Sequence, residues 1–286
     1  MNDERLLILL GNQLFPNDKI QESGCSQVFM AEDYDLCTYY SHHKHKIIFF
    51  LSILFFWELL IRFTEPPPYI LPTPYSVLIS FKENFMLIYE HALVTIIEVL
   101  IGLTVGIILG MITALILEIF VTARLVFRPL LIFSQSIPVF AIAPLLTLWL
   151  GYGILSKVVM AILIIYFPVT SAFHDGLSQT PKRYLDLAKT MGGTPWRNLL
   201  YLKIPHSIPS LCSGIKLASV YAPIGAVIGE WVGSSQGLGY LMILANGRVK
   251  TDLMFASLLT LGLLSITLFS LISYLLQISL TKYLRT

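Results

Sequence analysis

Long apolar segments separated by short polar ones dominate the chain after residue 46. A helix needs about 20 mostly apolar residues to cross a bilayer, where each backbone polar group must find its partner within the protein. Six segments approach or exceed this length. They are Ile47–Phe63, Ala92–Leu117, Pro129–Leu150, Ile154–Phe173, Ser210–Gly229 and Leu253–Leu280. The pattern predicts an all-α integral membrane protein with about six transmembrane helices.

The composition favours the same location. Of 286 residues, 56% are hydrophobic and 13% charged, with a mean hydropathy of +0.75, whereas soluble domains are about 25% charged. A net charge of +2 gives no basic field for a nucleic-acid partner. The three cysteines, Cys25, Cys37 and Cys212, form no paired or metal-binding pattern. We therefore exclude an ordinary cytosolic enzyme and a disordered protein, and expect no catalytic residues and no metal.

The distribution of Lys and Arg predicts the orientation, because short cytoplasmic loops are enriched in them. With the N-terminus inside, thirteen of the 19 basic residues fall on the cytoplasmic side and five on the other, with Lys216 in a span. Both termini are therefore expected in the cytoplasm. The apolar segment Leu6–Leu10 is too short for a signal peptide, so we expect no cleavage.

Small residues and prolines mark the second and third spans. Gly102, Gly106 and Gly110 recur every four residues and present a smooth face that another helix can approach closely. Glycine is also simply common in membrane helices. Pro138 and Pro144 lack backbone donors and are expected to kink or interrupt the third span. Such breaks suit a wall that opens and closes, although they also occur in static bundles.

Acidic residues inside predicted spans leave a second class of function open. Such residues often mark the relays of secondary carriers driven by an ion gradient. Glu58, Glu98 and Glu230 are the candidates, but each lies nearer an end of its predicted span than the middle. Lys216 lies about two turns into its span, from where its amine can reach the interface. No inverted repeat is evident, so a carrier is the less favoured interpretation.

The segment His174–Pro209 is the longest loop after the N-terminal tail, and it carries signals of local structure. Thr180-Pro181 is typical of a helix N-cap with proline at the first helical position, and Gly192-Gly193 is a typical helix stop. Thr194-Pro195 repeats the start and opens a second helix. The segment is therefore predicted to form two short helices joined at a glycine corner.

Two features of these helices concern their surroundings. Pro205 and Pro209 are expected to end the second helix. The first helix has an apolar face opposite its charged residues, formed by Tyr184, Leu185, Ala188 and Met191. This face either packs on the protein's own spans or binds a partner in the cytoplasm, and the spacing favours neither.

The loop resembles a family signature. Asp186-Leu187-Ala188, Gly192, Leu202-Lys203-Ile204-Pro205 and Pro209 are similar to the EAA loop of type I ABC importer permeases. That pattern runs Glu-Ala-Ala, three residues, Gly, nine residues, Ile, any residue, Leu-Pro. Further matches to the nitrate, sulfonate and taurine branch are Trp57-Glu58, Leu71-Pro72-Thr73-Pro74, Pro138, Pro144-Leu145, Trp149-Leu150-Gly151, Gly214, Lys216, Glu230 and Gly237-Leu238-Gly239. The resemblance covers about residues 48–286, with Asp186 where glutamate is usual and Glu98 where many relatives carry a base.

The resemblance implies a type I permease fold in a bacterial inner membrane. Its loop would dock on separate cytoplasmic ABC ATPase subunits through Asp186, Ala188, Gly192, Gly193, Leu202, Pro205 and Pro209. Residues with an expected part in the translocation path or in helix packing are Gly102, Gly106, Gly110, Pro138, Pro144 and Glu230. ATP and Mg²⁺ would bind the ATPase, because this chain has no Gly-rich loop ending in Gly-Lys-Ser/Thr.

Further implied partners are a periplasmic solute-binding protein and a second permease subunit, with a homodimer expected. The branch carries nitrate, sulfonates, taurine and vitamin precursors of the pyrimidine or riboflavin type, so the resemblance does not fix the solute.

Residues 1–46 differ abruptly from the rest and are polar throughout. Arg5–Gln13 and Val28–Lys46 resemble the beginning of photolyase-related proteins. We therefore expect two parts, a non-functional fused fragment at 1–46 and a permease domain at 47–286. The cluster His42–Lys46 could bind metal or anionic lipid headgroups, but a juxtamembrane basic stop that fixes the orientation is the simpler interpretation.

Overall fold

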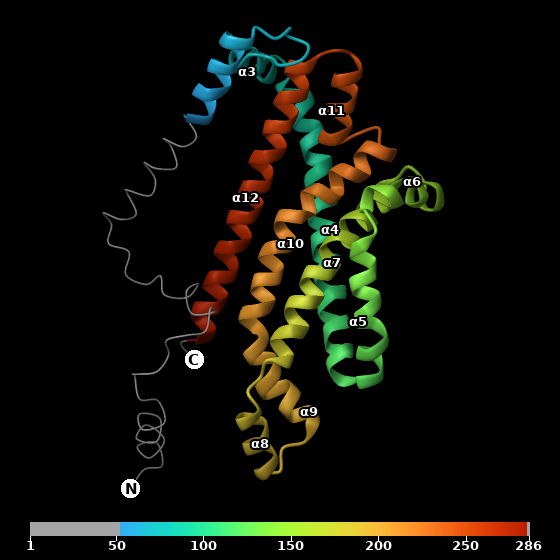
Figure 1. The fold of residues 1–286 in the computed structure, drawn as a ribbon, viewed down its shortest axis with the longest axis vertical. Helices are drawn as coiled ribbons and strands as arrows, with labels where there is room; N and C mark the ends of the chain where they lie inside the picture. The colour runs from blue at the N-terminus through green and yellow to red at the C-terminus, as the bar shows by residue number, and fades with distance from the viewer. Residues whose placement is uncertain (1–51, 285–286) are drawn as a thin grey trace, which may run out of the picture. The chain divides into compact units, whose positions relative to one another are not determined.

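The computed structural model describes residues 52–284, and all regular structure within them is helical (Figure 1). The predictions for residues 1–46 and the start of the first span lie outside the described residues; residues 52–64 form a helix. The helices that follow are α3 (Pro74–Glu83), α4 (Phe85–Ile119), α5 (Val121–Ser136), α6 (Val139–Leu150), α7 (Ile154–Ser178), α8 (Lys182–Thr190), α9 (Pro195–Asn198), the π-helical turn η2 (Leu199–Lys203), α10 (Ile204–Gly233), α11 (Leu238–Gly247) and α12 (Thr251–Leu284).

Four helical segments are long and apolar enough to cross a membrane. They are Phe85–Ile119, Ile154–Ser178, Pro195–Gly233 and Thr251–Thr281. These segments contain the predicted second, fourth, fifth and sixth spans. Each apolar run forms a helix, because a helix satisfies its own backbone polar groups in lipid. With α5 and α6 counted as one broken span, the described residues contain up to five, so the predicted number of six is not established.

The third predicted span, Pro129–Leu150, is two helices and not one. α5 ends at Ser136, α6 begins at Val139, and the two are bent by 98°. Pro138 is the N-cap of α6 and has no N–H to continue a helical hydrogen-bond ladder from α5. The helix is thus interrupted at Pro138, whereas Pro144 lies inside α6 and does not end it.

The main core is formed by α4, α7 and α10, which pack through small and branched side chains. Its buried residues are Val99, Leu103, Ala161, Ile165, Val169, Ala218, Ala222 and Ala226. α12 adds Leu268 and Ile272 from one side. Alanine at the contact positions lets the helix axes come close, as is typical of helix packing in membranes.

The glycine face of α4 packs against α7. A Cβ atom at Gly102 would lie 2.7 Å from the Cβ of Ala161, and one at Gly106 would lie 3.0 Å from Ile165. At Gly110 the corresponding distance, to Val169, is 2.9 Å. Real Cβ atoms hardly ever come this close to other heavy atoms. The spacing of four residues therefore matches a helix contact that leaves no room for a side chain.

Two charged residues lie deeper in their helices than the sequence suggested. α4 begins at Phe85 and not at Ala92, so Glu98 is closer to the midpoint of α4 than to either end. α10 begins at Ile204, which places Lys216 near its middle. The expectation that both lie near the ends of spans is wrong for these helices. Glu230 does lie in the last turn of α10.

The loop is shorter than predicted, because α7 continues to Ser178 and α10 follows η2 without a break. The prediction that Pro205 and Pro209 end the second short helix is wrong. The N–H of Ile204 donates to the carbonyl of Leu199, five residues back, and this wider turn precedes Pro205, which lacks an N–H. Segments α8 and α9 lie at one end of the helices, and α3 and α11 lie at the other (Figure 1).

Candidate functional site

The glycine corner between α8 and α9 is built by backbone geometry. α8 ends at Thr190, Gly192 has a φ of +80°, and the N–H of Gly193 donates to the carbonyl of Ala188 at 2.7 Å. Only glycine adopts a positive φ without strain. A Cβ at Gly193 would collide with the same carbonyl oxygen at 2.7 Å. Each glycine is therefore required, the first for its backbone angle and the second for space.

The starts of the two short helices differ. The hydroxyl of Thr194 accepts a hydrogen bond from the N–H of Arg197, with Pro195 at the first helical position, as predicted. Thr180 does not cap α8, because its hydroxyl donates back to the carbonyl of Leu177 and Pro181 occupies the cap position. The second helix is thus fixed at its start by a side chain, and the first is not.

No residue of α8 is buried, although the helix carries apolar side chains. The exposed fractions are 59% for Leu187 and 80% for Met191, and Trp196 of α9 is 62% exposed. Asp186 pairs only with Lys189 of the same helix, at 3.3 Å, and such exposed pairs contribute little to stability. Among the described residues, the protein's own spans do not cover this face, which favours the alternative of a cytoplasmic partner.

Glu118, next to the end of α4, joins this loop to the helices. Its side chain is 5% exposed, and its carboxylate accepts hydrogen bonds from Arg124 of α5 at 2.9 Å and from Lys203 of η2. His174 Nε2 of α7 lies 4.0 Å away. Ion pairs shielded from water are screened less than surface pairs. The loop is thereby held to α4 and α5 by charge as well as by chain connection.

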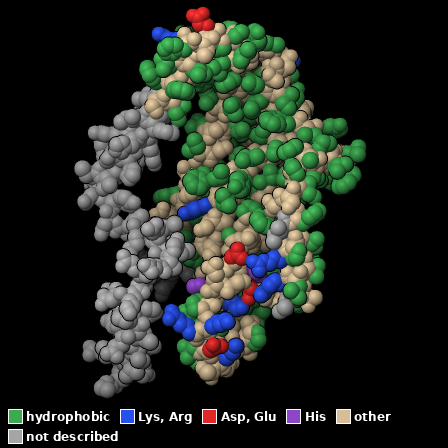
Figure 2. Space-filling model, in the orientation of Figure 1, with side chains coloured by type: hydrophobic (Ala, Val, Ile, Leu, Met, Phe, Trp, Pro, Cys, Tyr) green, Lys and Arg blue, Asp and Glu red, His purple; other side chains and the backbone are tan. Residues whose placement is uncertain are grey.

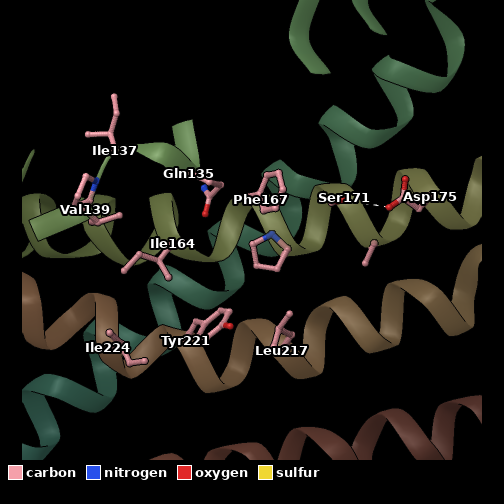
Figure 3. Close-up of a pocket in the computed structure, with 13 residues that line it drawn as sticks. Gln135, Ile137, Val139, Ile164, Phe167, Ser171, Asp175, Leu217, Tyr221 and Ile224 are labelled. Atoms are coloured by element: carbon pink, nitrogen blue, oxygen red, sulfur yellow. Dashed lines mark hydrogen bonds between the residues drawn. The ribbon is translucent and has the colours of Figure 1, made fainter. Parts of the chain in front are cut away.

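A groove of about 680 Å³ opens where the break between α5 and α6 faces α7 and α10 (Figure 3). Gln135 and Pro138 line it from the break, Phe167 from α7 and Tyr221 from α10. Asp175, at the end of α7 that leads to α8, is the one charged residue in the lining among residues 52–284. The groove offers aromatic faces, an amide, a hydroxyl and an acid, which is a lining suited to a small polar solute.

Most residues predicted for the translocation path or for helix packing lie outside the lining of the groove. Of that group, Pro138 lines the groove, Pro144 is exposed inside α6, and the three glycines of α4 face α7. The sequence prediction missed Gln135, Tyr221 and the acid at Asp175. The predicted fourth span ends at Phe173, whereas α7 continues to Ser178, so the prediction places Asp175 in the loop and not in the helix. A charged residue that continues the helical pattern past Phe173 was the available signal.

Glu230 belongs to a buried polar cluster at the α11 end. Its carboxylate accepts hydrogen bonds from the hydroxyl of Thr95, at 2.6 Å, and from the N–H of Gly239. Glu98, one turn further along α4, pairs with Lys157 of α7 at 2.8 Å. Glu98, Glu230 and Lys157 are each at most 4% exposed. Three helices and the start of α11 therefore meet at this cluster.

Comparison with known proteins gives consistent relatives. Residues 106–285 match the family model of the binding-protein-dependent transport system inner membrane component. A probable ABC transporter permease protein of Haemophilus influenzae is 49% identical over 79% of this chain and 92% of its own length. The formylaminopyrimidine transport permease protein ThiX of Halalkalibacterium halodurans is 37% identical, over 77% and 88%. The riboflavin transport system permease protein RibX of Chloroflexus aurantiacus is 35% identical, over 77% and 82%.

A solved structure shares the fold. One chain of the MetNI methionine ABC transporter, in a structure described as inward facing, matches with a TM-score of 0.57. The match covers 68% of this chain and 97% of that chain at 15% sequence identity, so it concerns the fold alone.

The apolar helices, the broken span and the matching fold define a helical membrane permease, which is a transport component and not a catalytic enzyme. The chain belongs to the family of binding-protein-dependent transport system inner membrane components, the permeases of ABC transporters. The resemblance found in the sequence is confirmed. Membership of this family also disfavours the secondary carrier considered above.

A second family model matches residues 7–54, the deoxyribodipyrimidine photo-lyase-related protein. This confirms the resemblance of the N-terminal segment, nearly all of which lies outside the described residues. The division into a fragment at 1–46 and a permease domain at 47–286 stays a prediction.

Proposed function

We propose that this chain is the permease subunit of an ABC importer and forms the path by which a small solute crosses the inner membrane. A separate cytoplasmic ATPase binds ATP and Mg²⁺, and a periplasmic binding protein delivers the solute. The observation that supports this most is the loop, in which α8 and the capped α9 meet at a rigid glycine corner and display uncovered apolar side chains. An exposed, conformationally fixed apolar surface is what a docking partner requires.

The proposed docking residues occupy one continuous segment. Asp186 and Ala188 lie on α8, Gly192 and Gly193 form the corner, and Leu202 lies in η2. Pro205 and Pro209 lie in the first turns of α10, so a movement of the loop is transmitted directly into that helix. The contact between Lys203 and Glu118 provides a second route, into α4 and α5. Both routes end at helices that line the groove or flank it.

The orientation follows from the charges. Lys and Arg gather at the end of the molecule that carries α8 and α9 (Figure 2). Because cytoplasmic segments are enriched in these residues, we place this end, together with both termini, in the cytoplasm. The ATPase would then meet α8 and α9, and the binding protein would meet the end with α3 and α11.

A second permease subunit would complete the path. The groove lies beside α5 and α6, which expose large apolar side chains such as Phe133, Phe140 and Trp149. A second copy of this chain placed against these helices would enclose the groove and separate the solute from lipid. We therefore propose a homodimer, consistent with the frequency of two-fold symmetric assemblies.

For the solute, the lining of the groove favours a vitamin precursor over nitrate, sulfonate or taurine. Phe167 and Tyr221 offer ring faces, and Asp175 is the only charged group in the lining. Asp175 also lines a smaller adjoining cavity, and there it shares the lining with a cationic side chain, Arg128. An acid disfavours an anionic solute and accepts hydrogen bonds from a ring amine. Two similar relatives are named for formylaminopyrimidine and riboflavin transport.

Uptake measurements test the proposal. Cells that express this permease with a cognate ATPase and a cognate binding protein would receive labelled formylaminopyrimidine, riboflavin or taurine. We expect uptake of a ring-shaped solute to stop when ATP is depleted while the ion gradient is kept. Uptake that persists under those conditions would contradict an importer driven by ATP. ATP-dependent uptake of taurine alone would support the importer and contradict the solute class.

A further inference from the structure

The buried cluster near α11 has one negative charge too many. Glu98 and Glu230 are 0% and 1% exposed, and in the described part of the chain the one cationic side chain beside them is Lys157, 4% exposed. The other side chains at the cluster are those of His91 and Thr95 on α4, and of Tyr240 on α11 next to His91. His91 Nδ1 accepts a hydrogen bond from the N–H of Gly237, which identifies that nitrogen as unprotonated.

The hydrogen bonds of the cluster leave one atom without a partner. Glu230 uses both oxygens, one for the hydroxyl of Thr95 and one for the N–H of Gly239. The hydroxyl of Thr95 in turn accepts from the N–H of Leu238 at 2.9 Å. Glu98 accepts from Lys157 through Oε1 only, and its Oε2 is buried with no partner among the described residues. Thr95, whose hydroxyl is bonded to Glu230, lies one turn before Glu98 on α4, so the two carboxyl groups belong to the same buried cluster.

We propose that this cluster binds one proton, held between Glu98 Oε2 and the carboxylate of Glu230. The proton comes from hydronium in the solvent, which becomes water as one of its O–H bonds breaks and an O–H bond forms at Glu98 Oε2. Glu98 Oε2 then donates to Glu230, so each carboxyl oxygen of the cluster has a partner. The charges of Lys157 and Glu230 cancel. Two buried carboxylates in one cluster with a single cation, Lys157, would otherwise leave an uncompensated charge in a dry environment, which is strongly unfavourable.

A proton fits this position better than a metal cation. The ammonium group of Lys157 lies 2.8 Å from Glu98 Oε1 and would repel a second cation at the same carboxyl. Among residues 52–284, no group of three or more His, Cys, Asp or Glu side chains is arranged to hold a metal ion. Sodium and calcium need several oxygen ligands at once. The cluster offers two carboxyl groups that already have donors.

The bound proton holds α11 to three helices. The N-terminal N–H groups of α11, at Leu238 and Gly239, are bonded through Thr95 and Glu230 to α4 and α10. Lys157 adds α7 through Glu98. Loss of the proton would leave two anionic carboxylates in the same buried cluster and weaken this junction. The inference concerns a binding site at the end opposite the loop and does not depend on the proposed transport function.

Infrared spectroscopy of the purified full chain tests the proposal directly. A protonated carboxylic acid has a carbonyl band separate from those of carboxylates. We expect wild type to show this band at neutral pH, to shift it on exchange into heavy water, and to lose it at high pH. Glu98→Gln and Glu230→Gln should each remove the band. Glu98→Gln should fold, because its amide can donate to Glu230 as the proposed acid does.

Glu118→Gln is the matched control, because Glu118 is also nearly buried but its carboxylate is bonded to two cationic side chains, Arg124 and Lys203. It should leave the band unchanged. If a glutamine variant at Glu98 or Glu230 fails to fold, Thr95→Val keeps both acids and should shift the band without removing it. Absence of the band in wild type at neutral pH, or its persistence in both glutamine variants, would overturn the proposal. A sodium-dependent rise in thermal stability without the band would also overturn it, in favour of a cation.

Discussion

Lys203 and Glu118 are 85 positions apart in the sequence and bind each other where the loop meets the end of α4. Arg124 binds the same carboxylate from the start of α5, and α5 leads to the break that borders the groove. Lys203 on the loop is therefore connected to α5, at the wall of the proposed path, through the buried side chain of Glu118. Coupling through a contiguous set of contacts of this kind is testable by removing its central member.

Replacing Glu118 with glutamine should impair transport while the protein still inserts. A hydrogen bond between charged groups contributes about 1.5–3 kcal/mol, so loss of this contact should lower uptake by roughly tenfold, the factor that about 1.4 kcal/mol represents. Uptake per molecule of ATP hydrolysed is the measurement. Glu83→Gln, at an exposed position of α3, is the control. Equal uptake by both variants would show that the contact does not transmit movement.

Gly192→Val should abolish uptake, because the loop would no longer stimulate ATP hydrolysis by the ATPase. The φ of +80° costs a side chain roughly 1–2 kcal/mol, and the branched side chain would also project from the corner that docks the ATPase. Gly151 offers a matched control, because it has a φ of +81°. Like Gly192, it has open space around the position that a Cβ would occupy. Gly151→Val carries the same backbone strain at the other end of the molecule. Both proteins should reach the membrane, and only Gly192→Val should lose stimulated ATPase activity.

Local features of the fold were predictable from the sequence. The long apolar runs predicted four of the spans, because a run of this length satisfies its backbone polar groups in lipid by forming a helix. The cap at Thr194 and the stop at Gly192 were recognisable from residue type, since capping and positive φ depend on neighbouring atoms. The bend of 98° after Ser136 was not predictable in size, because proline removes a donor without setting an angle.

Contacts between distant residues were not predictable in this way. Thr95 and Glu230 are separated by 135 positions, and Glu98 and Lys157 by 59. No periodicity within one helix indicates which residue of another helix will face it. The sequence showed that charges within apolar helices need partners, but it did not identify those partners. The groove was missed for the same reason, since four separate helices, α5, α6, α7 and α10, line it.

The glycine face of α4 gives a prediction about stability. Gly102→Leu would place its Cβ 2.7 Å from the Cβ of Ala161, and overpacking of this kind costs about 1–3 kcal/mol. The melting temperature of the purified protein should fall by several degrees. Gly262→Leu on α12 is the control, because no atom lies within 4 Å of the Cβ position there. Similar melting temperatures for the two variants would show that α4 and α7 can move apart without loss of stability.

Tyr221 gives the sharpest test of the groove as the path of a ring-shaped solute. Its ring belongs to α10 and lines the groove beside Leu217 (Figure 3). Aromatic pairs contribute about 0.5–1.5 kcal/mol beyond the area they bury, so Tyr221→Leu should lower the uptake rate for riboflavin or formylaminopyrimidine by roughly three- to tenfold. ATP hydrolysis stimulated by the loaded binding protein should stay unchanged, because the docking loop is intact. Tyr274→Leu, at an exposed position of α12 outside the groove lining, is the matched control. If Tyr221→Leu reduced ATP hydrolysis and uptake equally, Tyr221 would act in the movement of the helices and not in contact with the solute.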